Sequence, residues 1–410
     1  MLNKDKQREL AYVVTIDEIK PIPGKDRVEC AVVGGWTIMV RKGQFEPGGV
    51  GIYFEIDSKV PETEPFAFLM QKKYKIKTQK YKTPEGQFWS QGLLMSAEDF
   101  GWEVQIEPLG GVRTEVIIDD EGNAHYADDE SRFLTKKLGV VYSVAEDNKR
   151  KGNSADKYKR MAQRHGKLFA KQPFRWLMQR DWGRKFLFVF YGKKKDGRNW
   201  PQWVKKTDEE RVENMPWVLQ DKSGWVATEK IDGTSTTFTM KRKAFGRNEF
   251  YVCSRNVVFD KPDKECFYDT NVYLEMAQKY NIEKVLTDLL NKLPAWEWVT
   301  IQGETYGAGI QKNDYGLDSH NFMAFNLVNS VEGRLGTLSM EAVLTPMGVP
   351  CVPVIDSNYK LPDTIEELRD WVHGESTVCN RLKEGIVFRK PDGSTSFKCV
   401  DPEYLIKYHG

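Results

Sequence analysis

A lysine at the end of a predicted strand is the residue that most directly suggests covalent chemistry in this sequence. Lys230 lies in the segment Glu-Lys-Ile-Asp-Gly at 229–233, between an apolar stretch and the β-branched run at 234–239. A lysine amine can form a covalent intermediate that divides one difficult reaction into two easier steps. Because Lys-x-Asp-Gly also occurs in ordinary turns, its meaning depends on the segments that follow it.

Five further segments follow Lys230 in a fixed order, and all of them lie within about 170 residues of it. Each could be a plain strand or turn, but the ordered set is difficult to ascribe to chance. The segments are Ser-Arg-Asn at 254–256, Gly-Glu-Thr-Tyr-Gly at 303–307, Phe-Met-Ala-Phe-Asn at 322–326, Glu-Gly-Ile-Val-Phe-Arg at 384–389 and Ser-Phe-Lys at 396–398.

The ordered set resembles the motifs of the covalent nucleotidyltransferases, the superfamily of ATP-dependent polynucleotide ligases and capping enzymes. The individual forms are similar to those of its RNA ligase branch. N-terminal segments resemble the OB module of the OB-bearing RNA ligases typified by the Deinococcus enzyme, and 206–214 resembles the segment that opens their catalytic domain. The resemblance covers about residues 10–100 and 200–410, and the N-terminal segments are 22–27, 34–36, 53–58 and 90–94.

The resemblance implies an ATP-dependent RNA ligase that joins a 3′-OH end to a 5′-phosphate end, as in RNA repair. ATP would adenylate the lysine, the AMP would pass to the 5′-phosphate, and the 3′-OH would displace it. ATP and Mg²⁺ or Mn²⁺ are the implied cofactors. The implied partner is a nicked RNA or RNA/DNA duplex whose 3′-OH strand is RNA, which a protein can recognise through the 2′-OH groups of a wide minor groove.

The catalytic residues implied by the resemblance are Lys230, Glu384 and Lys398. Glu384 would hold the metal ion or its water, and Lys398 would contact the α-phosphate. At an ordinary pKa of about 10.4, only roughly 0.04% of a lysine is neutral at pH 7, so we expect the pKa of Lys230 to be lowered. Many relatives carry Lys-x-Lys in the last motif, whereas Val400 replaces the second lysine here. Lys407 is a substitute to consider, although a lysine near the end of the sequence is more often a solvated charge.

The resemblance implies four further nucleotide-binding residues besides Lys398 and Lys407. Arg255 would contact AMP or the 5′-phosphate of the RNA, and Glu304 would accept a hydrogen bond from a ribose hydroxyl. Phe325 would stack on adenine, with Phe322 as the alternative ring. Glu229, which precedes the nucleophile, completes the set.

A basic block at residues 149–206 stands out from an otherwise acidic chain. It holds 19 Lys or Arg and 3 Asp, a balance of +16, whereas the net charge of the whole chain is +2. Basic residues bind phosphates and exposed rings stack on bases, but an amphipathic helix or a contact with an anionic membrane would leave the same pattern. The rings are Phe169, Phe174, Trp176, Trp182, Phe186, Phe188, Phe190 and Tyr191.

Short apolar strands separated by turns predict a small β-barrel in the first part of the chain. We expect an OB-type module at 1–118, although strand propensity alone does not separate it from an SH3-like barrel. Residues 110–129 suggest a small hairpin, and 119–200 suggest a partly helical linker. Residues 201–410 mix strands with helices at 271–293 and 364–373, which predicts an α+β nucleotidyltransferase domain.

Composition narrows the remaining classes of function. None of the six cysteines forms a Cys-x-x-Cys pair, which argues against a zinc site. The polar N-terminus and the lack of a long apolar run predict a soluble, cytoplasmic protein with no membrane contact, and we expect a monomer. An ATP-dependent DNA ligase or capping-type enzyme stays open, as does a non-catalytic module that only binds nucleic acid. DNA ligases and capping enzymes generally place an OB domain after the last motif, which favours an RNA ligase here.

If the chain is a ligase, the two ends of the sequence should contribute differently. We expect lysine adenylation to need only ATP, metal and the residues from Trp203 onward. The OB module and the basic block should then serve end joining, because that step also needs a grip on a polyanionic duplex.

Overall fold

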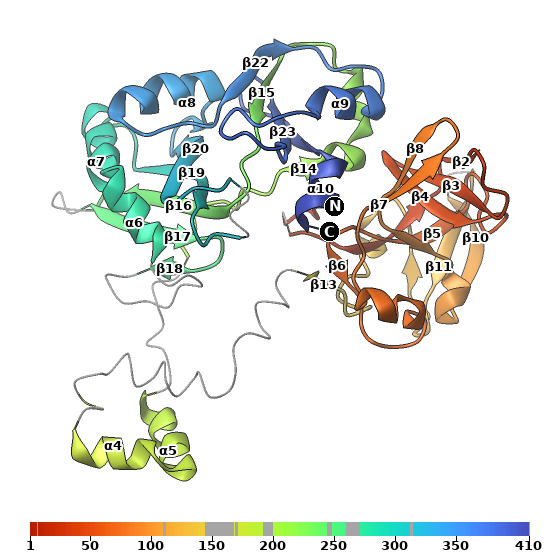
Figure 1. Ribbon diagram of the computed structural model, residues 1–410, viewed down its shortest axis with the longest axis horizontal. Helices are drawn as coiled ribbons and strands as arrows, with labels where there is room; N and C mark the ends of the chain where they lie inside the picture. The colour runs from red at the N-terminus through yellow and green to blue at the C-terminus, as the bar shows by residue number, and fades with distance from the viewer. Residues whose placement is uncertain are drawn as a thin grey trace.

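The protein is described by a computed structural model that covers residues 1–5, 7–109, 112–143, 168, 171–191, 200–243, 248–259, 271–311 and 315–409. An all-β N-terminal domain and an α+β C-terminal domain lie side by side (Figure 1). This division agrees with the fold class expected from the sequence.

The strands of the N-terminal domain follow the alternation of apolar and polar residues in the sequence. In β4 (Trp36–Arg41) every second side chain is buried, as expected for a strand with one face on a core. β5 (Val50–Phe54) is buried throughout because it lies between β1 (Ala11–Thr15) and β9 (Leu93–Met95). The other elements are β2 (Glu18–Pro21), β3 (Val28–Val33), β6 (Ser58–Lys59), η1 (Ala67–Lys72), β7 (Gln79–Thr83), β8 (Gly86–Ser90), η2 (Ala97–Phe100), β10 (Glu103–Leu109), β11 (Val112–Ile118), β12 (Ala124–His125), η3 (Glu130–Arg132) and β13 (Val141–Tyr142).

The N-terminal domain continues past residue 118. Leu134 and Val140 belong to the same buried cluster as Val13 and Ile52, and β13 pairs with β6. The hairpin expected at 110–129 also begins earlier, because β10 already pairs with β11. We therefore propose a domain boundary near residue 143 in place of 118.

The C-terminal domain contains two sheets, and all their strand pairs are antiparallel except β14 with β24. The six-stranded sheet has the order β18-β17-β16-β19-β20-β21, and the five-stranded sheet has the order β14-β24-β23-β15-β22. The strands are β14 (Glu210–Arg211), β15 (Trp225–Glu229), β16 (Thr234–Lys241), β17 (Glu249–Ser254), β18 (Val258–Phe259), β19 (Trp298–Gly307), β20 (His320–Asn329), β21 (Gly333–Arg334), β22 (Val354–Tyr359), β23 (Gly385–Arg389) and β24 (Ser396–Val400); three short 3₁₀ turns, η4 (Val212–Asn214), η5 (Pro216–Gln220) and η7 (Thr345–Met347), join them.

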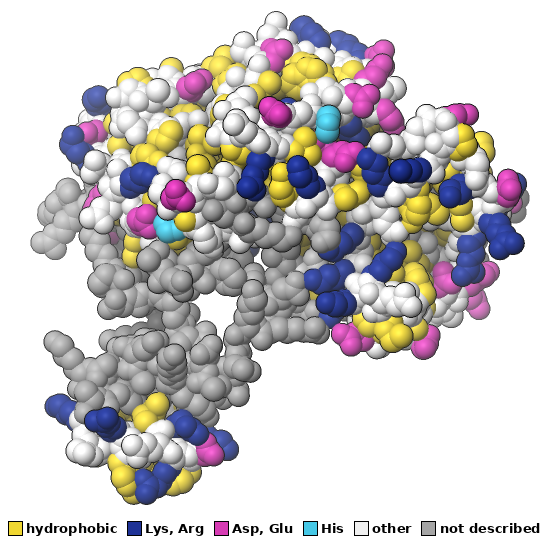
Figure 2. All heavy atoms as spheres, viewed as in Figure 1, with side chains coloured by type: hydrophobic (Ala, Val, Ile, Leu, Met, Phe, Trp, Pro, Cys, Tyr) yellow, Lys and Arg dark blue, Asp and Glu magenta, His cyan; other side chains and the backbone are white. Residues whose placement is uncertain are grey.

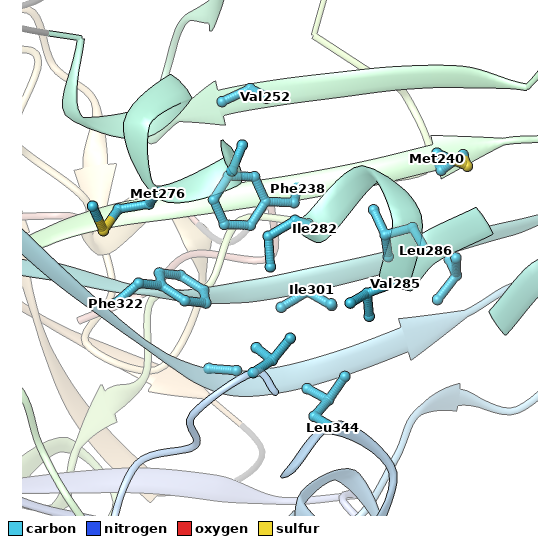
Figure 3. Close-up of a cluster of buried hydrophobic side chains, with 14 of the residues drawn as sticks. Phe238, Met240, Val252, Met276, Ile282, Val285, Leu286, Ile301, Phe322 and Leu344 are labelled. Carbon is cyan, nitrogen blue, oxygen red and sulfur yellow. The ribbon is translucent and has the colours of Figure 1, made fainter. Parts of the chain in front are cut away.

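Helices pack against the six-stranded sheet and bury its apolar side chains. α6 (Val272–Lys279), α7 (Ile282–Lys292) and α8 (Thr337–Leu344) contribute to this core. Phe238, Ile301 and Phe322 project into it from three strands, with Leu286 facing them from α7 (Figure 3). The core thus fixes the sheet whose strands β19 and β20 carry the candidate site residues Glu304 and Phe325.

Both helices predicted in this domain are present, and their starts follow local capping rules. The region 271–293 is a helix pair, and the side chain of Asn271 accepts the Leu274 N–H at 3.2 Å. At the start of α9 (Ile365–Val372), the Thr364 hydroxyl accepts the Glu367 N–H at 3.2 Å and Glu367 returns the contact. This reciprocal pair is a capping box.

The two domains share an apolar cluster. Val400 and Leu405 of the C-terminal domain pack with Tyr12, Trp36 and Tyr53 of the N-terminal domain. Leu405 lies on α10 (Pro402–His409). A shared core of this kind holds the domains together, so a site between them can be built from both.

The described part of the basic block forms α4 (Gln172–Met178) and α5 (Asp181–Tyr191). Leu187 of α5 is buried against α4, whereas Trp182, Phe186 and Phe190 are exposed. None of the described helices combines the length and the apolar character needed to cross a bilayer.

Candidate active site

A pocket of about 590 Å³ lies between the two sheets of the C-terminal domain and the edge of the N-terminal domain. Seven of the eight residues expected at the site line it, although they come from segments far apart in the sequence. These seven are Glu229, Lys230, Arg255, Glu304, Phe325, Glu384 and Lys398.

Lys230 follows directly on β15, which is held between β22 and β23. Its backbone N–H donates to the Gly385 carbonyl at 3.0 Å, and its Nζ donates to Glu384 Oε2 at 2.7 Å. Gly233 is required two residues after Ile231 because a Cβ there would lie 2.3 Å from the Thr305 carbonyl oxygen. The motif therefore sets the lysine at the floor of the pocket through backbone contacts with two neighbouring strands.

The expectation of a lowered pKa for Lys230 is wrong for the protein without ligands. Burial alone would lower its pKa, but the carboxylates of Glu384, Glu304 and Asp232 outweigh burial, so the pKa is raised. These carboxylates therefore favour the ammonium form of Lys230.

Three carboxylates surround Lys230. Burial, together with Glu384 and Asp232, raises the pKa of Glu304 to about 8, even though Lys230 opposes this shift. Asp232 is fixed by the Tyr404 hydroxyl, which donates to its Oδ2 at 2.9 Å. Within the described residues, no three His, Cys, Asp or Glu side chains form a closed metal cage. Oxygen donors without a cage suit Mg²⁺ or Mn²⁺, since Mg²⁺ commonly binds through one or two carboxylates, water and substrate phosphates.

Lys398 lies on β24 and is nearly buried beside other cations. Burial, Arg8, Arg211 and Lys230 lower its pKa to about 7. Arg211 is also buried, and its Nε and Nη1 have no hydrogen-bond partner among the described residues, although its Nη2 is 3.4 Å from Asp57 Oδ2. A cluster of crowded cations with unsatisfied donors is suited to an anion such as a phosphate.

Arg255 and Glu229 lie at the pocket with protein partners already in place. Arg255 is half exposed and forms an ion pair with Asp208. Glu229 is buried and accepts hydrogen bonds from the Ser376 hydroxyl and from the N–H and hydroxyl of Thr377, the latter two at 2.8 and 2.6 Å. Glu229 therefore also has a structural role that its place in the motif did not indicate.

The two candidate rings for adenine lie in different places. Phe325 lines the pocket, with the Arg389 guanidinium 5.9 Å from its ring centroid. Phe322 is fully buried in the core of the six-stranded sheet (Figure 3). Alternation along β20 separates them, because residues three apart on a strand point to opposite faces. The geometry supports Phe325.

Lys407 is the one expected site residue that the structure does not bring to the pocket. It is exposed on α10, with its Nζ 5.2 Å from the centroid of the Tyr408 ring. Leu405, on another side of the helix, lines the pocket instead. The position two residues after Lys398 is filled by Val400, which also lines the pocket.

Sequence analysis missed the contribution of the N-terminal domain to this pocket. Arg8 and Asp57 line it, and Arg8 is held by Glu55 through contacts of 3.0 and 3.2 Å. Arg211 was within the segment quoted for the resemblance, so a signal existed for it. Arg8 lies in a polar N-terminal segment with no motif, so only the three-dimensional structure reveals it.

Family models match part of each domain. Residues 223–409 match the family model described as RNA ligase, and residues 10–95 match a model described as an OB-fold domain. The second match decides between the OB and SH3-like alternatives. No curated protein sequence matches the chain.

Solved structures of Naegleria gruberi RNA ligase share the fold over nearly the whole chain. A mutant of that enzyme with ATP and manganese gives a TM-score of 0.65 at 24% identity, over 98% of both chains. The same enzyme with pyrophosphate gives 0.62 at 23% identity, over 98% of this chain and 99% of that chain.

Proposed function

We propose that this chain is an ATP-dependent RNA ligase that carries AMP covalently on Lys230, with the RNA ligase domain after the OB-fold domain. The observation that carries this proposal is the contact of 2.7 Å between Lys230 Nζ and Glu384 in a pocket that also holds Glu304, Phe325 and Lys398. Each comes from a different motif, and the fold brings all five to one place.

In the first step the Lys230 ammonium would lose a proton to solvent or to a neighbouring carboxylate, and the neutral amine would attack the α-phosphorus of ATP. An N–P bond forms, the bond from phosphorus to the bridging oxygen breaks, and pyrophosphate leaves with the electron pair. Lys398 would stabilise the negative charge that develops on the α-phosphate, because it is a buried cation fixed on a strand. Phe325 would stack on the adenine and Glu304 would accept a ribose hydroxyl.

Mg²⁺ or Mn²⁺, which we infer to bind at Glu384, would supply positive charge beside the α-phosphate and the amine. Glu384, which directly precedes β23, is positioned for this role by the Asp401 N–H, which donates to its carbonyl at 2.9 Å. Its contact with Lys230 orients the amine toward the same place.

In the second step the enzyme would pass AMP to the 5′-phosphate of the RNA, and in the third step AMP would be released. An oxygen of the 5′-phosphate attacks the AMP phosphorus, the N–P bond breaks, and Lys230 is regenerated. The 3′-OH then attacks the 5′-phosphate of the adenylylated end, a phosphodiester forms, and AMP leaves. Arg255 is half exposed at the pocket and could meet the incoming 5′-phosphate.

We propose that the substrate is a nick whose 3′-OH strand is RNA. The test uses nicked duplexes with an RNA or DNA residue at the 3′-OH side and, separately, at the 5′-phosphate side. An RNA 3′-OH is expected to be sealed about 10-fold faster or more, because only RNA offers the 2′-OH contacts. Equal rates, or faster sealing of a DNA 3′-OH, would contradict this preference. Labelling with GTP in place of ATP separates the ligase from a capping-type enzyme.

The N-terminal domain is expected to contribute to adenylation, which reverses the expectation drawn from the sequence. Arg8 lines the pocket beside Lys398, so Arg8→Gln should slow labelling by ATP about 10-fold, since one charged contact to phosphate is worth about 1.5–3 kcal/mol. Arg27→Gln, an exposed residue of the same domain, serves as the control. Unchanged labelling by a folded Arg8→Gln protein would instead support the expectation that adenylation needs only the residues from Trp203 onward.

We also propose that the basic block helps to hold the substrate. Its described helices present Trp182, Phe186 and Phe190 to the solvent, which suits stacking with bases. Four further basic residues of the block, Lys193, Lys194, Lys195 and Arg198, lie outside the described residues.

A further inference from the structure

A second basic feature lies in the OB-fold domain itself. Residues 72–82 hold six lysines and no acidic residue, a segment that we call the lysine stripe. It starts at the end of η1 and continues into β7. Its lysines are Lys72, Lys73, Lys75, Lys77, Lys80 and Lys82.

The backbone of the stripe is anchored to the domain at Ile76. Ile76 is buried in the core of the domain, and its N–H and carbonyl pair with the Ser58 carbonyl and the Asp57 N–H, each at 2.9 Å. Since neighbouring residues on an extended chain point to opposite sides, the inward Ile76 sends Lys75 and Lys77 outward.

The stripe contacts residues at and next to the active-site pocket. Asp57, which pairs with the stripe, lines the pocket. Further along, Lys80 forms an ion pair with Glu403 of α10, two residues before the pocket residue Leu405. Figure 2 shows Lys and Arg side chains gathered on the face where the two domains meet.

The pocket rim adds basic residues on the other side. Lys205 and Lys206 are exposed and line the pocket, as does the half-exposed Arg255. Basic side chains therefore lie both at the mouth of the pocket and along the OB-fold domain beside it. A polyanionic strand that enters the pocket would meet both sets.

Part of the stripe carries charge that the protein does not neutralise. Lys72, Lys73 and Lys82 are exposed, and among the described residues no carboxylate forms an ion pair with them. Rings accompany the charge on the β7–β8 hairpin, where Tyr81 and Phe88 lie with centroids 6.4 Å apart. Unneutralised lysines interleaved with rings are typical of surfaces that bind a nucleic-acid backbone.

We propose that the lysine stripe binds the phosphate backbone of the nicked duplex where it leaves the active site. This proposal rests on the proposed function, because it takes the pocket as the place where the nick is sealed. Charge and proximity to the pocket favour nucleic acid over an acidic protein as the occupant. The stripe would thus set the affinity for the duplex and leave the adenylation of Lys230 unaffected.

The test compares two triple variants of the full-length protein that remove equal charge. The first is Lys72→Gln, Lys73→Gln and Lys82→Gln. The control is Lys136→Gln, Lys292→Gln and Lys360→Gln, which are exposed lysines outside the stripe and the pocket. For each, binding of a nicked duplex is measured across a salt series, together with lysine labelling by ATP and the KM and kcat of sealing.

The stripe variant is expected to bind the nicked duplex about 10-fold more weakly at moderate salt and to raise KM similarly. The slope of log K against log salt should fall in magnitude by about 2–3, since each lost phosphate contact removes about 0.9. Labelling by ATP and the kcat of sealing should stay within about 2-fold of the wild type, and the control variant should match the wild type in all four measurements.

Two outcomes would overturn the proposal. Binding curves of the stripe variant that superimpose on those of the wild type would exclude the stripe as a binding surface. An equal loss in the control variant would show that only net charge matters. A wild-type protein that is not labelled by ATP would instead refute the proposed function, so the two failures are distinguishable.

Discussion

Replacing Lys230 by alanine is expected to abolish covalent labelling of the protein by ATP. The variant lacks the amine that would form the N–P bond, which in the protein contacts Glu384 at 2.7 Å. Loss of a nucleophile that acts with its surrounding groups typically removes several orders of magnitude in rate. The measurement is transfer of label from ATP to protein in the presence of Mg²⁺.

Two further variants test whether labelling requires the amine of Lys230 itself. One keeps a positive charge at this position, and the other removes a lysine elsewhere. Lys230→Arg retains a cation beside Glu384 but should be equally inactive, because a guanidinium stays protonated. Lys360→Ala removes an exposed lysine far from the motifs and should be labelled like the wild type. Labelling of Lys230→Ala at more than a small fraction of the wild-type level would remove Lys230 from the role of nucleophile.

Lys398→Met is expected to lower the rate of adenylation by about 10²–10³, by analogy with the loss of one preorganised donor at a transition state. Lys407→Met should change the rate less than about 3-fold, because that side chain is exposed outside the pocket. The two variants differ in the same way from the wild type, so the comparison isolates position. Equal damage in both would mean that Lys407 supplies the second lysine missing from the last motif.

Lys398→Met should also stabilise the protein in the absence of nucleotide. The pKa of Lys398 is lowered to about 7 in the folded state by burial, Arg8, Arg211 and Lys230, whereas Asp208 opposes the shift. In the unfolded state this lysine stays protonated up to about pH 10.4. The free-energy cost of burying it in the folded state therefore applies in full below about pH 7 and falls as the pH rises toward 10. Lys398→Met should therefore raise the free energy of unfolding by a few kcal/mol at pH 6 and by much less at pH 9–10. An equal gain in the free energy of unfolding at both pH values would contradict the lowered pKa of Lys398.

The parts of this structure that depend on local sequence could be predicted. The capping box of Thr364 and Glu367 and the position of Lys230 at the end of a strand follow from residues a few places apart. The two-domain architecture followed from alternation and from the ordered motifs. The sequence favoured Phe325 over Phe322 as the adenine-stacking ring but could not decide between them. The choice depends on which face of β20 lies toward the pocket.

The features that the sequence did not indicate depend on distant contacts. Arg8 lies more than 380 residues before Lys398 in the chain, yet it is close enough to lower the pKa of that lysine. The raised pKa of Lys230 arises from Asp232 of its own motif together with Glu304 and Glu384, which lie on two distant segments, and the sequence does not show that all three meet around the lysine. Leu134 and Val140 extend the N-terminal domain because they complete its core, although their own segment has no strand pattern.

Locating the AMP within the wild-type protein tests the central claim most directly. The protein is incubated with ATP and Mg²⁺, freed of nucleotide and digested, and the modified residue is identified by mass spectrometry. Attachment of AMP to Lys230, with release of that AMP when a nicked duplex is added, is the predicted result. AMP on a different residue, or no covalent adduct from a folded and metal-supplied protein, would contradict the account.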